Sequence, residues 1–217
     1  MSVKKLFEIG GYCAAACLVA FGIASLVLGV QGRNEVRKDV QREYIVGTPD
    51  MNKTAILAEA KAAKLPASIL ATLPTCNVAG KTIDTGARSK CFASYMRIHA
   101  LEATGGKTYA QMGRFLTKDG KDTNDSKLAA IDPKTKQPVE NAARNLWVTE
   151  TALTTALNTS FFAEQVSMFS VVIGIALMLA GFGFGILAFM AFRWVPAREE
   201  AKAKAAKAVV PKATLAT

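Results

Sequence analysis

Residues 166–192 read VSMFSVVIGIALMLAGFGFGILAFMAF, a run of 27 residues without a charged side chain. At a rise of about 1.5 Å per residue, a helix of this length spans roughly 40 Å, against about 30 Å for the hydrocarbon core of a bilayer. We therefore expect a transmembrane helix over 166–192 that tilts or protrudes from the membrane. Arg193 and Trp194 follow directly, and a basic and aromatic pair of this kind suits the headgroup interface. A buried helix of a soluble protein is the alternative, but such helices rarely run so long without a charge.

A second uncharged run lies near the other end of the chain, where residues 9–30 read IGGYCAAACLVAFGIASLVLGV. As a helix it spans about 33 Å, which matches the bilayer core. The alternative is a cleaved signal peptide, because Lys4 and Lys5 provide a short basic start. The run is longer than the ~7–15 residues of a signal core, and no clear A-x-A cleavage site follows it. The sequence thus predicts two transmembrane helices, 9–30 and 166–192.

Basic residues beside the two spans predict their orientation. No Lys or Arg lies between Arg144 and the second span, whereas several follow it closely: Arg193, Arg198, Lys202, Lys204 and Lys207. The positive-inside rule places this cluster in the cytoplasm, and two spans place both termini on the same side. We expect a multi-pass protein of the cell membrane with a cytoplasmic N-terminus (1–8), an extracytoplasmic domain (31–165) and a basic cytoplasmic tail (193–217). The tail is rich in Ala and Lys, and we expect it to be disordered.

The segment between the spans has mainly helical patterns. Val36, Val40 and Tyr44 recur every four residues, which extends the first helix to about Tyr44, and no Pro or Gly interrupts the chain from Val139 to Gly174. Shorter helices are expected over 54–65, from there to Leu73, and over 91–103 and 109–116, with loops at 74–90 and 117–137. We predict a mainly α fold in which the two transmembrane helices form an extended antiparallel hairpin with a small helical extracytoplasmic domain between them.

The four cysteines fall into two pairs. Cys13 and Cys17 lie on one face of the first span, where we expect them to act as small apolar packing residues. Cys76 and Cys91 lie in the predicted extracytoplasmic domain, where a disulfide suits an oxidising compartment. It would close a loop of about 15 residues, worth roughly 3 kcal/mol in the chain-entropy model. Two unpaired thiols are the alternative.

Few residues suggest chemistry. His99 is the chain's one histidine, which excludes His-rich metal sites and most His-ligated iron centres. Cys91 lies about 12 Å from His99 along one predicted helix, too far to share a proton, although spacing does not exclude Cys76. We therefore expect no catalytic residue, no metal and no cofactor, and a protein that is not an enzyme. Tyr95, His99 and Glu164 are the candidate contacts for a ligand or partner, with packing and interfacial solvation as the alternatives.

Small residues recur on both spans. Ala16, Ala20 and Ala24 repeat every four residues, and Gly181 and Gly185 form a G-x-x-x-G motif. Small faces let helices approach closely and drive their packing in lipid. The partner is the other span, a second copy of the chain or another membrane protein.

Two stretches carry a resemblance to known proteins, RIHALEATGGKTYAQMGR (97–114) and ALNTSFFAEQVSMFSVVIGIALMLAGFGF (156–184). They resemble a group of small actinobacterial membrane proteins of unknown function with two spans around an outer loop. Some of these carry an automatic label as aromatic ring-opening dioxygenases. Iron sites of that kind need two histidines and a carboxylate, and this chain has only His99, so no catalytic residue is carried over.

These observations predict a non-enzymatic accessory or scaffold protein of the cell envelope, in contact with membrane lipid and with another membrane protein or a second copy. The net charge of +10 is dispersed and no nucleic-acid motif occurs, so nucleic acid is not an expected partner. The alternative is a membrane-tethered ligand-binding or sensor module with a pocket near His99 and Tyr95. A thiol-dependent enzyme using Cys76 or Cys91 is the third hypothesis.

Overall fold

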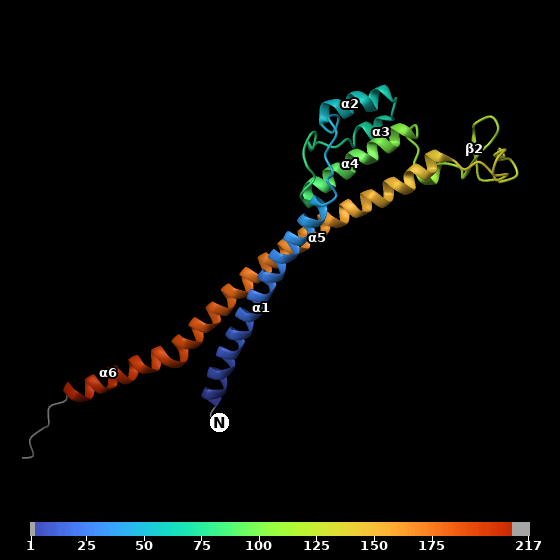
Figure 1. Ribbon diagram of the computed structural model, residues 1–217. Coiled ribbons are helices and arrows are strands. Elements are labelled where there is room, and N and C mark those ends of the chain that lie inside the picture. Colours follow the sequence, from blue (N-terminus) through green and yellow to red (C-terminus); the bar gives the residue numbers. More distant parts are fainter. Residues whose placement is uncertain (1–2, 210–217) are drawn as a thin grey trace, which may run out of the picture. The chain divides into compact units, whose positions relative to one another are not determined.

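The structure, a computed structural model, describes residues 3–209 and is mainly helical (Figure 1). Two compact units divide the chain. The helix-pair unit comprises the described residues up to Gln31 and from Ser167 onward, and the central unit is Gly32–Val166. The elements are, in order, α1 (Val3–Gln41), α2 (Lys53–Ala62), α3 (Ala67–Leu70), α4 (Gly86–Ala103), the 3₁₀ turn η1 (Tyr109–Gln111), β1 (Phe115–Leu116), β2 (Asp122–Thr123), α5 (Ala142–Phe189), the π-helical turn η2 (Met190–Trp194) and α6 (Val195–Val209).

In the helix-pair unit, α1 and α5 are each long and apolar enough to cross a membrane. The two helices meet at glycines, because a Cβ atom added at Gly22 would lie 2.8 Å from the carbonyl oxygen of Gly174. A Cβ atom at Gly29 would lie 2.7 Å from the carbonyl oxygen of Ser167. Near the other end of the contact, Gly11 faces Ala188, so the two segments run antiparallel. Only glycine permits this backbone approach, and small residues of this kind are common where helices pack closely.

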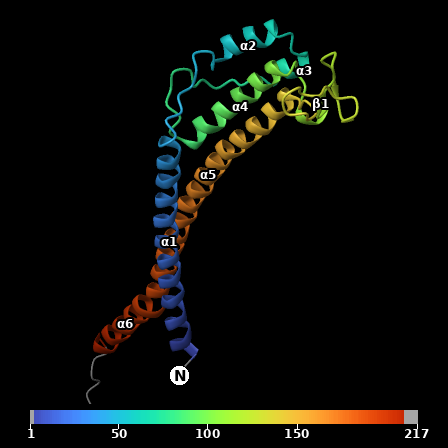
Figure 2. The ribbon, with the colours of Figure 1, turned by 45° about the vertical axis from the view of Figure 1, so that its right-hand side comes forward.

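In the central unit, α4 lies beside the first half of α5, and α2 lies on the other side of α4 (Figures 1 and 2). The buried core between these helices is apolar and consists mainly of Met51, Ile56, Ala60, Val78, Ile83, Tyr95, Ile98, Leu101 and Trp147. The indole N–H of Trp147 donates a hydrogen bond to the carbonyl of Lys107 at 2.8 Å, which ties α5 to the loop after α4. A disulfide between Cys76 and Cys91 joins the loop before α4 to α4 itself.

Local signals explain where the helices of the central unit begin and end. Asn52 caps α2 by accepting hydrogen bonds from the backbone N–H groups of Thr54 and Ala55. Thr85 caps α4 by accepting from the N–H of Arg88 at 3.3 Å. Gly105 and Gly106 follow α4 with φ values of 61° and 79°, a left-handed conformation that glycine adopts without strain.

Several expectations from the sequence are confirmed. The fold is mainly α, and a single helix, α5, runs from Ala142 to Phe189, which covers the predicted second span up to its last three residues; these lie in η2. The first helix ends at Gln41 and so stops just short of the expected Tyr44, where the backbone turns left-handed at a φ of 50°.

Three expectations were wrong. The helix expected over 91–103 begins earlier, at Gly86, because the Thr85 cap starts it there and shortens the predicted loop. The helix expected over 109–116 is reduced to η1, since Phe115–Leu116 pairs with Asp122–Thr123 as a two-stranded antiparallel sheet. The expected disordered tail is helical over Val195–Val209, where alanine and lysine are strong helix formers; residues 210–217 lie outside the described residues.

Candidate metal centre

Three separate segments bring ionisable side chains together on the central unit. Asp50 lies in the turn before α2, held by the hydrogen bond that the Asn52 amide donates to the carbonyl of Pro49 at 2.8 Å. Glu59 lies on α2, and His99 lies on α4. Because α2 packs against α4, the two helices and the turn present these side chains to one another.

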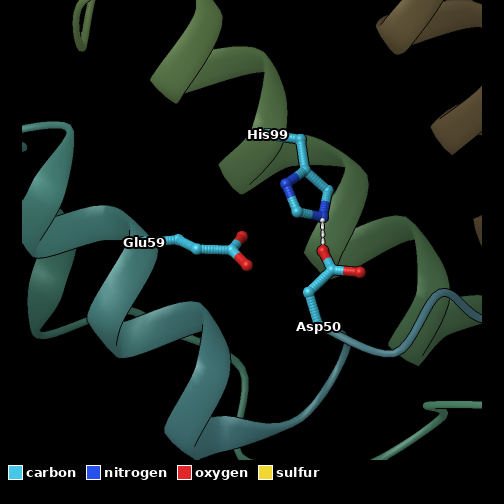
Figure 3. A group of neighbouring side chains, drawn as sticks. All are labelled: Asp50, Glu59 and His99. Atoms are coloured by element: carbon cyan, nitrogen blue, oxygen red, sulfur yellow. Dashed lines mark ion pairs between the residues drawn. The ribbon is translucent and has the colours of Figure 1, made fainter.

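The donor atoms of Asp50, Glu59 and His99 all lie within 4.8 Å of one another (Figure 3). The Nε2 atom of His99 lies 2.9 Å from Oδ2 of Asp50. Two ligands on one metal ion with bonds of about 2.0–2.2 Å lie roughly 3 to 4.4 Å apart. Glu59 is exposed, so its side chain is free to rotate toward the other two donors.

A fourth residue orients the imidazole from the opposite side. Glu102 lies one turn after His99 on α4, and its Oε2 atom lies 3.2 Å from Nδ1 of His99. In metal sites a ligating histidine usually gives its second ring N–H to a carboxylate, which sets the tautomer and the ring plane. Glu102 is placed for this role when Nε2 faces a metal ion.

The electrostatics of this cluster favour a cation. Partial desolvation of this largely exposed side chain, and then the charges of Asp50 and Glu102, raise the pKa of Glu59, while His99 opposes them. The Oε1 atom of Glu102 is buried and has no hydrogen-bond partner among the described residues. Three carboxylates thus surround one imidazole, and a divalent ion would offset their mutual repulsion.

Tyr95 lies close to the cluster but is closed to solvent. It is fully buried one turn before His99, and its hydroxyl donates a hydrogen bond of 2.6 Å to the carbonyl of Cys76. Burial and then the charge of Asp50 raise the pKa of this phenol. The side chain of Tyr95 is therefore engaged within the fold and is not exposed for contact with a ligand.

Glu164 lies in a different part of the central unit. It is buried and accepts hydrogen bonds from Nε of Arg33 at 3.1 Å and Nε of Arg37 at 2.9 Å. A third bond comes from the backbone N–H of Gly86 at 2.7 Å. All of its contacts are thus internal to the fold, and the structure does not bring it together with His99.

The small residues of the predicted spans divide between two environments. Gly181 lies against Ala15 and Val19 of α1, whereas Ala24 is exposed. Ala16 and Ala20 are also exposed, and together with Gly181 and Gly185 they line an apolar groove of about 610 Å³. The close contact between the two helices uses Gly181 together with Gly22, Gly29 and Gly174. The seven-residue spacing of Gly22 and Gly29 was a signal for that face.

The sequence reasoning missed Asp50, Glu59 and Glu102. A single histidine excludes a His-rich site, but it does not exclude a mixed site with one histidine and several carboxylates. The i, i+3 spacing of His99 and Glu102 was the available signal. Asp50 and Glu59 come from other segments, and nothing local in the sequence links them to His99.

Cys76 and Cys91 form a disulfide, so neither is a free thiol in this structure. A nucleophilic cysteine must be a thiolate, and the bonded pair offers none. Comparisons of the chain with protein-family models, curated proteins and solved structures find no match. The interpretation of the site therefore depends on its own geometry.

Proposed function

We propose that this chain is a two-span membrane protein whose central unit lies outside the cytoplasm and binds a divalent transition-metal ion. The observation that carries the proposal is the convergence of Asp50, Glu59 and His99, with donor atoms within 4.8 Å of one another. The function is ligand binding without catalysis, in the manner of a membrane-tethered sensor. This role is compatible with the resemblance to small two-span actinobacterial membrane proteins.

The donor set selects the class of ion. One imidazole nitrogen and carboxylate oxygens suit divalent transition-metal ions such as Zn²⁺ and Mn²⁺, while Ca²⁺ prefers six to eight oxygens. Zn²⁺ is expected to bind more tightly than Mn²⁺, following the general order of affinities for nitrogen and oxygen ligands. A bound ion would link α2 to α4 and to the turn at Asp50, so metal occupancy would stiffen one face of the central unit.

Charge and redox chemistry support the orientation. Arg193 and Arg198 follow the second apolar helix closely, which favours cytoplasmic placement of that end and, with two spans, of both termini. The disulfide between Cys76 and Cys91 fits an oxidising compartment for the central unit. The proposed topology is a membrane hairpin, with its metal-binding domain on the extracytoplasmic side.

The test is a Zn²⁺ titration of the full chain in lipid nanodiscs by isothermal calorimetry. One ion per chain is expected, with affinity falling at least tenfold in His99→Gln and Glu59→Gln. Glu43→Gln is the matched control, because Glu43 is an exposed carboxylate of the same unit that is not part of the cluster. The proposal fails if the wild type shows no stoichiometric binding, or if all three variants bind as the wild type does.

A membrane scaffold is the second candidate function. It is favoured by the groove lined by Ala16, Ala20, Gly181 and Gly185, whose small side chains suit close approach by another helix. The partner is then a second copy or another membrane protein within the lipid. Purification in mild detergent should recover a homo-oligomer or a stoichiometric partner, and a clean monomer with no partner would exclude this role without bearing on metal binding.

A further inference from the structure

A polar pocket of about 420 Å³ lies at the start of α5, away from the metal cluster in the sequence. Its lining comes from η1, from the segment around the two short strands and from the first turn of α5. The residues are Tyr109, Arg114, Asn124, Glu140, Arg144 and Asn145. None of them belongs to the proposed metal centre, so the inference below goes beyond the proposed function.

Two arginines line this pocket without an acidic partner. Within the part of the chain that the structure describes, neither Arg114 nor Arg144 forms an ion pair. The guanidinium of Arg144 lies 4.0 Å from the ring centre of Tyr109, and that of Arg114 lies 5.1 Å from the ring centre of Phe115. Stacking of this kind holds the planar groups in place but leaves their N–H donors unused.

At least one of these N–H donors is buried. Nε of Arg144 is buried and has no hydrogen-bond partner among the described residues. The one carboxylate in the lining, Glu140, accepts a hydrogen bond from the Asn145 amide at 3.2 Å. A buried N–H without an acceptor is costly, and the described residues leave this hydrogen-bonding capacity of Arg144 unmet.

The helix behind the pocket adds to the positive potential. α5 has 48 residues and begins at Ala142, so its positive end lies beside Arg144 and Asn145. Asn141 caps this end by accepting a hydrogen bond from the N–H of Ala143 at 3.1 Å. Two guanidiniums and a helix N-terminus thus outweigh the single charge of Glu140.

We propose that this pocket binds an oxyanion, a carboxylate or a phosphate, carried on a small hydroxylated molecule such as an acidic sugar. Arg114 and Arg144 would bind the oxyanion, because a guanidinium can donate hydrogen bonds to two oxygens of such a group at once. The Asn124 oxygen accepts from the backbone N–H of Arg114 at 3.1 Å, and the Asn145 nitrogen donates to Glu140. The Asn124 Nδ2, the Asn145 Oδ1 and the hydroxyl of Tyr109 are the neutral groups suited to ligand hydroxyl groups. The pocket volume exceeds the space that a bare ion needs.

The test uses the full chain in nanodiscs at low salt, titrated with D-glucuronate, D-glucose 6-phosphate and uncharged D-glucose by calorimetry. At least one charged sugar should bind saturably and at least tenfold more tightly than glucose. Preference for glucuronate would assign the source as a carboxylate, and preference for the phosphate ester as a phosphate. Absence of binding by both charged sugars, or equal binding of glucose, would overturn the proposal.

Three variants locate the binding. Arg114→Gln and Arg144→Lys should each weaken binding of the charged sugar at least tenfold, since lysine keeps the charge of Arg144 but loses the planar donor pair. Arg42→Gln removes one exposed guanidinium elsewhere in the central unit and should bind as the wild type does. Equal losses in Arg42→Gln would show a non-specific charge effect and would refute the site. Thermal melts establish whether each variant is folded. If Arg144→Lys does not fold, the binding measured for Arg114→Gln alone tests the site.

Discussion

The Oε2 atom of Glu164 accepts a hydrogen bond of 2.7 Å from the backbone N–H of Gly86, the first residue of α4. The Oε1 atom of the same carboxylate accepts from Arg33 and Arg37 of α1. One buried side chain on α5 therefore caps α4 and pairs with α1. A Cβ atom at Gly86 would lie 2.7 Å from the Cα of Phe161, so α4 approaches α5 closely at this point. Glu164 thus joins three helices of the central unit.

Glu164→Gln should destabilise the central unit by about 1–3 kcal/mol. The change removes the charge that pairs with two arginines, and the loss is moderated because Arg33 and Arg37 are more than a third exposed. Thermal or denaturant unfolding followed by circular dichroism measures the effect. Glu35→Gln is the comparison, because Glu35 lies on the same stretch of α1 and forms no ion pair within the described part of the chain. Equal effects of the two changes would contradict the assigned role of Glu164.

Low pH should weaken the contacts of Glu164 with Arg33, Arg37 and Gly86. Burial alone would raise the pKa of Glu164, but hydrogen bonds from Arg33, Arg37 and the Gly86 N–H outweigh it and lower the pKa below its ordinary value of 4.5. The native state then binds fewer protons than the unfolded state, so this stability is complete above about pH 4.5 and declines as the pH falls through the folded pKa. Wild type should lose more stability than Glu164→Gln between about pH 5 and pH 2. Parallel curves would refute the assignment.

Glu150→Met should stabilise the central unit by about 1–3 kcal/mol. Glu150 is 5% exposed on α5, and its Oε1 atom has no hydrogen-bond partner among the described residues. Replacing an unsatisfied buried polar group with an apolar one of similar size removes its desolvation cost. Glu43→Met, at an exposed position of the same unit, should change the free energy of unfolding by less than about 0.5 kcal/mol. The other oxygen, Oε2, accepts a long hydrogen bond of 3.4 Å from the Thr151 hydroxyl. A destabilised Glu150→Met would show that this bond outweighs the desolvation cost and would contradict the prediction.

Gly174→Val should disrupt the contact between α1 and α5 in the helix-pair unit. A Cβ atom at Gly174 would lie 2.7 Å from the carbonyl oxygen of Gly22 and 2.8 Å from the backbone nitrogen of Leu26, so the helices must separate. We expect a loss of about 1–3 kcal/mol, as for other overpacking changes, read as a lower melting temperature in detergent. Gly183→Val is the matched control on the same helix, since nothing lies within 4 Å of its added Cβ. Equal melting temperatures of the two variants would contradict the glycine contact.

Removal of the disulfide in a Cys76→Ser, Cys91→Ser double variant should cost about 3 kcal/mol, the value expected for a loop of this length. Reductant should lower the melting temperature of the wild type to that of the double variant and leave the double variant unchanged. Mass spectrometry of the non-reduced protein after alkylation checks the pairing directly. Label on Cys76 and Cys91 before reduction would show that the bond does not form.

Part of this fold follows from local sequence. The uncharged runs 9–30 and 166–192 predict long helices because length and apolarity are properties of a single segment. The uninterrupted stretch from Val139 to Gly174 predicts the continuity of α5, because only Pro or Gly would break it readily. The pairing of Cys76 with Cys91 was one of two open alternatives, and the structure contains the disulfide.

Sequence patterns predicted less well where contacts compete with local preference. Residues 109–116 have helical character, yet pairing of Phe115 with Thr123 across a short turn takes Phe115 and Leu116 into a strand. Phe115 and Thr123 lie on separate segments, and no periodicity in the sequence predicts their pairing. The helix face that meets α5 was also missed, since Gly22 and Gly29 contact it while Ala16 and Ala20 remain exposed.

The sequence by itself determined the two apolar helices, the mainly helical class and the single histidine on α4, because each depends on neighbours along the chain. Only the tertiary structure decided that Asp50 and Glu59 surround His99, and that Arg114 meets Arg144 in one pocket. These groups come from separate segments, and their meeting depends on how α2, α4 and α5 pack. Proposed sites of this kind form only when charged side chains from distant segments meet in the folded chain, and no local pattern of residues predicts that meeting.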